Sequence, residues 1–293
     1  MSDENSTIRS RELGDALRLA MERANLSGKR AAHVLGWSET KVSRMLTGRQ
    51  VFKDTDVSAL LALCSVTGDE KERLLELARQ YDQQGWLQKY SSDLTKQLRT
   101  LINHEARATE ITEFEPCFVP GLLQTGDYAQ ALLERSAMVP PDQIALRVRA
   151  RLSRQSIFSR DRHPRFTFFL HEQAFRLPVG GPAVMSGQLH HLLQMSVRRY
   201  ITIRVIPVAF GAHAGVAGAC RLMESAEFKP VVYIEEQTAG HFLEEPAEIA
   251  TYRKIFAAFA NCALDERESK DLIAELAVGL YADREDQDAV AQE

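Results

Sequence analysis

The sequence has no long apolar run and few cysteines. No apolar segment approaches the roughly 20 residues of a membrane-spanning helix, and the first ten residues, MSDENSTIRS, do not resemble a secretory signal peptide. The four cysteines are scattered and form no CxxC pair, which favours ordinary core thiols over a disulfide framework or a zinc site. They are Cys64, Cys117, Cys220 and Cys262. These absences predict a cytoplasmic protein without a membrane segment and without a bound metal.

Motifs for catalysis and cofactor binding are missing as well. His190 and His191 are neighbours on an expected helix, so they point to different faces and cannot form the one-face pair of a zinc site. The glycine-rich residues 211–218 lack the Lys-Ser or Lys-Thr that follows in a phosphate-binding loop, and there is no nucleophile elbow. His171 with Glu172 could form an acid–base couple, but we interpret the pair as ordinary polar residues at a strand end. We therefore expect no enzyme and no cofactor.

One stretch, SGKRAAHVLGWSETKVSRMLTGR, predicts two short helices joined by a tight turn. Ser27 is suited to cap the first helix, and Gly36 supplies the left-handed residue that ends it. Ser38 is suited to cap a second helix over residues 39–46, which Gly48 closes. Ala32 and Val42 complete the pattern, because a small residue at the crossing and a β-branched anchor in the core are typical of a helix-turn-helix. The second helix of such a motif lies in the major groove of DNA.

The charge of this stretch supports the interpretation. Between Ser27 and Lys53 there are six cations against one acid, a local charge of about +5 in a chain whose net charge is −4. The alternative is a solvated helical hairpin, but it does not explain the agreement of glycine, small-residue and charge positions. We therefore expect this face to contact phosphate.

The cap position assigns roles within the predicted interface. Side chains in the first turn and on the outer face of the second helix approach base edges, where Arg and Lys donate to guanine, Glu accepts from cytosine and Thr contacts a thymine methyl. The predicted base-reading residues are Glu39, Thr40, Lys41 and Arg44. The predicted phosphate contacts, which set register without reading sequence, are Lys29, Arg30, Ser43, Arg49 and Lys53.

The chain of 293 residues is too long for this module alone, and its length predicts two domains. Helical periodicity gives five short helices over residues 9–80, the compact all-α helix-turn-helix domain. Residues 80–92 are predicted to be a helical connector that contains the boundary. Residues 86–281 then read as a mixed α+β regulatory domain, and the acidic residues 282–293 as a disordered tail.

Within the second domain, short β-prone runs alternate with helical patterns. Strands are expected at residues 110–114, 166–171, 201–208, 219–223 and 231–235. Helices are expected from 94 to about 108 and over 127–135, 142–159, 183–197, 246–262 and 268–280. The alternation predicts a mixed α+β domain.

The N-terminal part resembles the xenobiotic-response-element (XRE) class of regulators, to which phage repressors belong. The second part resembles the C-terminal domain of unknown function found on many actinobacterial XRE-type regulators, which are described as antitoxin-like, and it is similar to the WhiJ-like proteins. The residues that carry this resemblance are EPCFVPGLLQTGDYA at 115–129, RVRARLSRQ at 147–155, LPVGGP at 177–182 and VYIE at 232–235. The resemblance implies a small acidic partner protein encoded nearby.

The VPGLLQTGDYA stretch is the candidate functional feature of the second domain. A turn, two core leucines and a capped helix explain it as structure, while a ligand or partner surface remains the alternative. The candidate partner or effector residues are Pro120, Gly121, Gln124, Thr125 and Tyr128.

The sequence thus predicts a sequence-specific DNA-binding transcriptional regulator whose second domain responds to the small partner protein. A small-molecule-sensing one-component repressor is the alternative, and an enzyme tethered to DNA is a third hypothesis. One short reader helix covers few base pairs, so the operator-bound form is expected to be a homodimer on double-stranded DNA.

Overall fold

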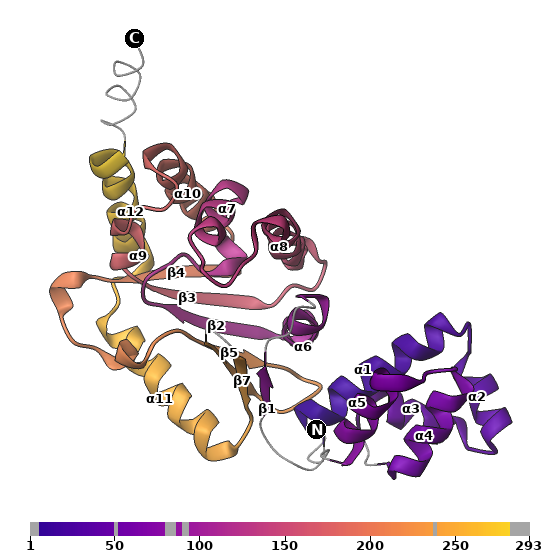
Figure 1. The fold of residues 1–293 in the computed structure, drawn as a ribbon. Helices are drawn as coiled ribbons and strands as arrows, with labels where there is room; N and C mark the ends of the chain where they lie inside the picture. Colours follow the sequence, from indigo (N-terminus) through magenta and orange to yellow (C-terminus); the bar gives the residue numbers. More distant parts are fainter. Residues whose placement is uncertain (1–5, 50–51, 80–85, 90–93, 237–238, 282–293) are drawn as a thin grey trace.

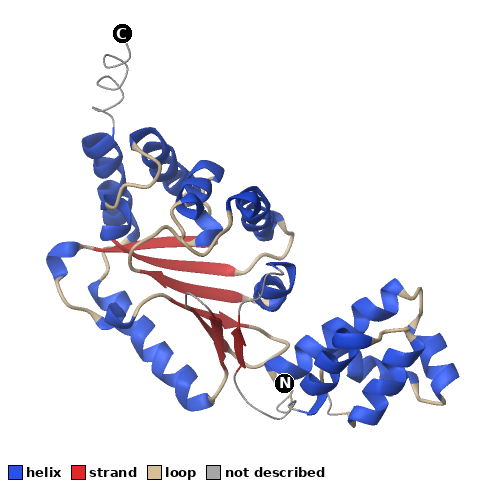
Figure 2. Cartoon of the chain, in the orientation of Figure 1, coloured by secondary structure: helices blue, strands red, loops and turns tan. Residues whose placement is uncertain are grey.

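The computed structural model describes residues 6–49, 52–79, 86–89, 94–236 and 239–281. A bundle of helices forms the N-terminal part, and a sheet with helices on both faces forms the rest (Figures 1 and 2). This confirms the predicted fold class, an all-α helix-turn-helix domain followed by a mixed α+β domain. Within those ranges, no helix is both long and apolar enough to cross a bilayer.

The helix-turn-helix is built as its capping residues predict. The five helices are α1 Ile8–Arg23, α2 Gly28–Leu35, α3 Glu39–Thr47, α4 Asp54–Leu63 and α5 Gly68–Arg79. The Ser27 hydroxyl accepts a hydrogen bond from the backbone N–H of Arg30, and the Ser38 hydroxyl accepts one from that of Lys41. Gly36 and Gly48 end α2 and α3 in the left-handed conformation, with φ of 67° and 64°. Both caps satisfy backbone groups that a short helix would otherwise expose.

Two glycines allow α1 to contact the end of α3 directly. A Cβ on Gly14 would lie 2.7 Å from the carbonyl oxygen of Leu46, and one on Gly48 would lie 2.5 Å from that of Ser10. The Ser10 hydroxyl donates to the carbonyl oxygen of Gly48 at 2.9 Å, and Arg18 donates to that of Leu46 at 2.8 Å. The position of the reader helix α3 is therefore fixed by α1.

In the described part of the second domain, seven strands form one sheet in the order β1-β7-β6-β5-β2-β3-β4. They are β1 Trp86–Lys89, β2 Glu110–Glu115, β3 Arg165–His171, β4 Ile201–Ile206, β5 Cys220–Glu224, β6 Val231–Glu235 and β7 Ala239–Leu243. The strands β2, β3 and β4 are parallel, and the remaining pairs are antiparallel. The parallel half needs crossover helices, which α7, α8 and α10 supply.

The helices cover the two faces of this sheet unequally (Figure 1). They are α6 Leu94–Arg107, α7 Gly126–Glu134, α8 Pro141–Arg154, α9 Gln173–Arg176, α10 Pro182–Met195, α11 Pro246–Cys262 and α12 Glu266–Tyr281. One core includes α7, α10 and α12 against β2, β3 and β4, and Ile8 of α1 belongs to it. The other core places α11, through Phe256 and Phe259, on the opposite face.

Two features differ from the predictions, and a third prediction is not tested. The residues expected to be a helical connector include β1, which pairs antiparallel with β7, and neither strand was predicted. The strand β1 gains its hydrogen bonds from β7 over a long sequence separation, a stabilisation that local propensity does not register, while β7 also pairs with β6. Cys117 is exposed instead of buried in the core. The predicted tail, residues 282–293, lies outside the described residues.

The contact between α1 and α3 can be tested at its glycines. Gly48→Ala places a methyl group against the Ser10 backbone, whereas Gly36→Ala carries the same left-handed strain with nothing within 4 Å. We expect Gly36→Ala to cost about 1–2 kcal/mol of unfolding free energy and Gly48→Ala about 1–3 kcal/mol more, because of overpacking. Urea unfolding followed by circular dichroism measures both. Equal losses in the two variants would contradict the proposed close approach.

Candidate nucleic-acid interface

The helix α3 presents a polar face to solvent and an apolar face to the bundle. Val42 and Met45 are buried, which fixes the rotation of the helix about its axis. The predicted base-reading residues Glu39, Thr40 and Arg44 are all exposed. The structure therefore brings three of the four predicted base-reading side chains onto one accessible surface.

Lys41, the fourth, lies to the side of this surface. Its ammonium group is 2.8 Å from a carboxylate oxygen of Asp56 at the start of α4 and 4.1 Å above the centre of the Trp37 ring. A cation held by an ion pair and an aromatic face must give up both contacts to reach a base. In this structure Lys41 connects α3 to α4, a role that its position in the helix does not reveal.

The predicted phosphate contacts lie in and next to the helix-turn-helix helices. Their side chains are all exposed. Two lie in α2, one lies in α3, one follows the end of α3, and one directly precedes α4. They are Lys29, Arg30, Ser43, Arg49 and Lys53. This arrangement gives a basic rim around a polar reading surface, as backbone contacts in a helix-turn-helix require.

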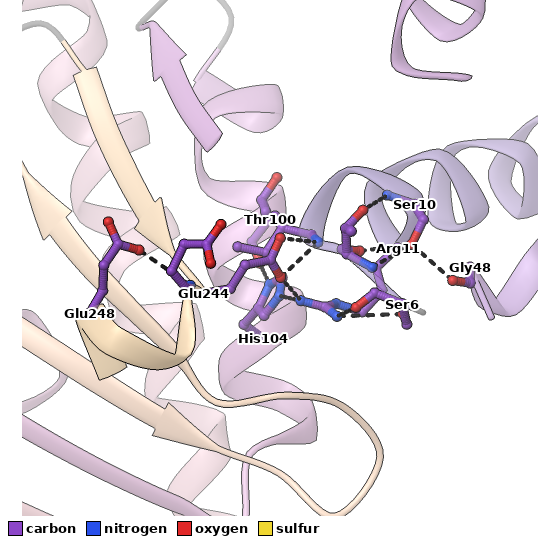
Figure 3. Close-up of polar contacts among 11 residues, drawn as sticks. Ser6, Ser10, Arg11, Gly48, Thr100, His104, Glu244 and Glu248 are labelled. Atoms are coloured by element: carbon purple, nitrogen blue, oxygen red, sulfur yellow. Dashed lines mark hydrogen bonds and ion pairs between the residues drawn. The ribbon is translucent and has the colours of Figure 1, made fainter. Parts of the chain in front are cut away.

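The first half of α1 is also buried against the second domain, and Arg11 is the centre of this junction (Figure 3). Its guanidinium contacts the Glu244 carboxylate at 3.4 Å, His104 Nε2 at 3.2 Å and the Ser6 carbonyl oxygen at 3.0 Å. The backbone N–H of Ile8 donates to both oxygens of Glu244 at 3.1 Å. A buried charge needs such partners, because leaving it without them would cost several kcal/mol, about 3–5.

Further polar contacts join α1 to α6. The Thr100 hydroxyl donates to Glu12 at 2.6 Å. Asn103 and Arg107 both donate to Asp15, at 2.7 Å and 2.9 Å. Since α1 also contacts α3 through its glycines, one helix connects the reader helix to the second domain. We refer to the contacts of α1 with α6 and Glu244 as the α1–α6 junction.

The hydrogen bonds of His104 define its protonation state. Its Nδ1 is 2.8 Å from the Thr100 carbonyl oxygen, so Nδ1 carries the proton and Nε2 accepts from Arg11. Burial, and then the charge of Arg11, lower the pKa of His104 to about 3. Burial also lowers the pKa of Arg11 to about 10, against the opposing charge of Glu244. At neutral pH the junction therefore holds a charged arginine beside a neutral imidazole.

The candidate residues of the VPGLLQTGDYA stretch are mostly interior. Tyr128 and Gln124 are buried, the Thr125 hydroxyl caps α7, and Pro120 and Gly121 begin a short turn of 3₁₀ helix. Gln124 donates to the Val119 carbonyl oxygen at 2.7 Å and accepts from Arg151 of α8 at 2.6 Å. In this structure the stretch positions an arginine and presents little surface of its own.

The histidine couple considered from sequence is not hydrogen-bonded within itself. His171 Nδ1 accepts from the backbone N–H of Gln173, while Glu172 accepts from Arg176 and from the backbone N–H of Val208. A search of the described residues for three or more His, Cys, Asp or Glu side chains placed to hold a metal ion finds none.

Sequence reasoning missed the α1–α6 junction. Arg11, Glu12 and Asp15 look like ordinary solvated charges of an amphipathic helix, and their partners lie about 90 to 230 positions away. One signal was available, since three charges within five positions interrupt the apolar spacing of a short helix.

This arrangement, a capped helical pair with an exposed polar reader face and a basic rim, defines a helix-turn-helix DNA-binding protein. A family model described as a helix-turn-helix domain matches residues 12–74. The chain belongs to the family named for its domain of unknown function, DUF5753, whose model matches residues 98–275.

Other comparisons add little. A comparison with curated proteins gives no match. Among solved structures, a chain of TrmBL2, an archaeal chromatin protein whose structure is reported to show a novel mode of DNA binding, matches with 10% identity over 82% of this chain and 88% of its own. Its TM-score is 0.31, so the likeness carries no argument about fold or function.

The predicted division between base reading and phosphate contact gives the first test of the interface. On a duplex selected from a random library, Arg44→Ala should cost about 1–3 kcal/mol of binding free energy and relax the preference at one position. Arg49→Ala should weaken binding to all DNA sequences alike and reduce the number of counterions released on binding by about one. Arg23→Ala, an exposed arginine at the far end of α1, is the control. Gel-shift titrations that show the same loss for all three variants would rule out the assignment.

The buried neutral His104 predicts a pH dependence of stability. Because its folded pKa is about 3 against an ordinary value of 6.5, the unfolded chain binds the proton first. Its contribution is thus complete above pH 6.5 and is lost as the pH falls toward 3, with a slope of about 1.4 kcal/mol per pH unit. His104→Gln keeps an acceptor for Arg11 but does not titrate. Denaturant unfolding between about pH 6.5 and 4.5 should show a shallower slope in the variant, and identical slopes would contradict the lowered pKa of His104.

Proposed function

We propose that this protein is a transcriptional regulator that binds a specific duplex operator through α3, and that its second domain controls how α3 is presented. The observation that carries the proposal is the α1–α6 junction. Arg11 is held by Glu244 and His104 of the second domain, and one turn further along the same helix Gly14 contacts the end of α3. A change in α6 is thereby transmitted to the reader helix through a single rigid element.

The second domain acts in this proposal as a receptor and not as an enzyme. Glu172, the carboxylate nearest to a catalytic role, is occupied by Arg176 and a backbone N–H. The resemblance of the sequence to antitoxin-like regulators of the XRE class suggests a small acidic protein encoded nearby as the signal. A small-molecule signal is the second candidate, and a cleft in the second domain favours it.

The operator-bound form is proposed to be a homodimer. The nine residues of α3 reach only a few base pairs, so a genomic site needs two copies of the reader. Two-fold symmetry would separate the half-sites by about 34 Å, one helical turn, or by a multiple of it.

Selection of bound fragments from genomic DNA, followed by footprinting and sedimentation of the complex, tests this function. We expect a short, two-fold symmetric site occupied by two chains, with transcription from the adjacent promoter altered when the gene is deleted. Binding without sequence preference at physiological salt would contradict the proposed regulator and indicate an architectural DNA-binding protein.

The junction itself can be tested without touching the predicted DNA surface. Arg107→Gln combined with Asn103→Ala removes both contacts to Asp15, and both positions are only half-buried, so the fold should survive. If the second domain holds α3 in its operator-binding orientation, operator affinity should fall about 5- to 150-fold, while binding to random DNA, set by the basic rim, should be unchanged.

Arg165→Gln, which breaks an exposed ion pair with Glu110 elsewhere in the second domain, is the matched control. Fluorescence anisotropy with operator and random duplexes measures both affinities. An operator affinity equal to that of the unmodified protein in the Asn103–Arg107 variant would show that the two domains act independently.

A further inference from the structure

A large cleft opens in the second domain, beside α7 and α8. Its volume is about 1670 Å³, and its walls are the residues after α7, the α8 helix, the loop at 177–181 and the end of β6. Pockets for small molecules usually measure about 300–1,000 Å³, so this cleft has room for a ligand with an extended apolar body. Its lining includes residues of two segments that carry the family resemblance, RVRARLSRQ and LPVGGP.

Three arginines line the cleft: Arg135, exposed at the end of α7, and Arg147 and Arg151 of α8. Arg147 and Arg151 are four residues apart, so they lie on the same face of the helix, and both line the cleft. Arg151 is held by the side chain of Gln124, and burial lowers its pKa against the opposing charge of Glu235. Arg147 donates to Gln143 at 3.3 Å, yet its Nε is buried and has no hydrogen-bond partner among the described residues.

An apolar surface faces these arginines. Phe118 and Met138 line the cleft and are 40% and 55% exposed, although large apolar side chains are usually covered. Val179 and Leu132 extend the same surface inside the cleft. An apolar wall beside two guanidinium groups, one of them with a buried Nε that lacks a hydrogen-bond partner, matches a molecule with one anionic end and an apolar body.

The carboxylates of the cleft limit the number of negative charges that it can accept. Glu134, Glu235 and Glu236 also line it. Glu134 accepts from Gln130, and Glu236 is paired with His241, so both remain at the rim with their own partners. The charge of Glu235 already acts on Arg151. A ligand bearing many acidic groups would meet these carboxylates, so the cleft suits a ligand with a single anionic head.

We propose that this cleft binds an amphiphilic organic anion, with its carboxylate or phosphate head on Arg147 and Arg151 and its apolar body against Phe118 and Met138. The site would supply the signal for the small-molecule form of the proposed function, and only its effect on DNA binding depends on that function. Arginine suits both head groups, because its planar guanidinium donates two parallel hydrogen bonds.

The helix α8 also connects the cleft to the α1–α6 junction. One turn after the cleft residues, Arg154 forms two hydrogen bonds with Glu105 of α6, at 3.0 and 2.5 Å. Burial alone would raise the pKa of Glu105, but the charges of Arg154 and Arg221 together bring it below its ordinary value, so this pair is ionised. Glu105 is adjacent to His104, which holds Arg11. A ligand that shifts α8 therefore acts on the helix that positions the reader.

The experiment uses the full chain with decanoate, decyl phosphate and decanol as probes, each below its micelle concentration. Calorimetric titration and thermal melts should detect decanoate or decyl phosphate, and whichever binds more tightly identifies the head group. Decanol should bind at least tenfold more weakly. If neither anion binds, or if decanol binds as well as the anions do, the inference is overturned.

Three variants locate the binding site. Arg147→Gln should weaken anion binding at least tenfold, and Met138→Gln, at an exposed position that tolerates a polar side chain, should weaken it by removing apolar contact. Arg149→Gln, an exposed arginine on the same helix outside the cleft, should bind like the unmodified protein. Equal affinity in the Arg147 and Arg149 variants would place the ligand elsewhere.

An operator titration with and without the bound probe then separates the two proposals. Absence of probe binding overturns the site and leaves the regulator untouched. Probe binding at Arg147 that leaves operator affinity unchanged upholds the site and overturns the proposed coupling.

Discussion

The buried guanidinium of Arg11 is the constraint on which the arrangement of the two domains depends. A charge removed from water is tolerated only where hydrogen-bond acceptors surround it, and its acceptors come from a strand end, from α6 and from the chain before α1. Breaking any one of these contacts leaves a buried polar group without a hydrogen-bond partner, which lowers stability. The contacts therefore hold the domains together more specifically than apolar packing alone would. Because α1 is also in backbone contact with the end of α3 at Gly14 and Gly48, this specificity extends to the DNA-reading surface.

The second domain contains another buried arginine that is held by carboxylates. Arg221 of β5 contacts Glu105 and Glu113, and Arg154 reaches Glu105 from α8, so one carboxylate on α6 holds a strand and a helix at once. The charged layer lies between α8 and the sheet, while α10 and α12 cover the parallel strands with an apolar layer. A helix seated on charges has fewer interchangeable positions than one seated on leucines, because each displacement breaks directional bonds. Movements of α8 are therefore expected to be discrete and not gradual.

Local chemistry explains which parts of the fold could be predicted. Ser27, Ser38, Gly36 and Gly48 satisfy helix ends within four residues of themselves, so the boundaries of α2 and α3 follow from the sequence. The strands β2, β3 and β4 were predicted because β-branched and aromatic residues recur along them. The strand β1 was missed because its partner β7 lies far along the chain, and the junction was missed because the partners of its charged residues lie equally far away. The exposure of Glu39, Thr40 and Arg44 on α3 could be predicted from the rotation of the helix about its axis. The contact of Lys41 with Asp56 could not be predicted, because it depends on where α4 packs.

Ile8 belongs to the apolar core of the second domain although it opens the first helix of the DNA-binding domain. The two domains are thus not interchangeable modules joined by a tether. Recombination that exchanged the reader at the connector would leave a foreign side chain in this core and an uncompensated carboxylate at Glu244. A new DNA specificity is therefore more accessible by substitutions on the exposed face of α3 than by exchange of whole domains, and lineages that diversify this protein should retain its first helix while the reading residues change.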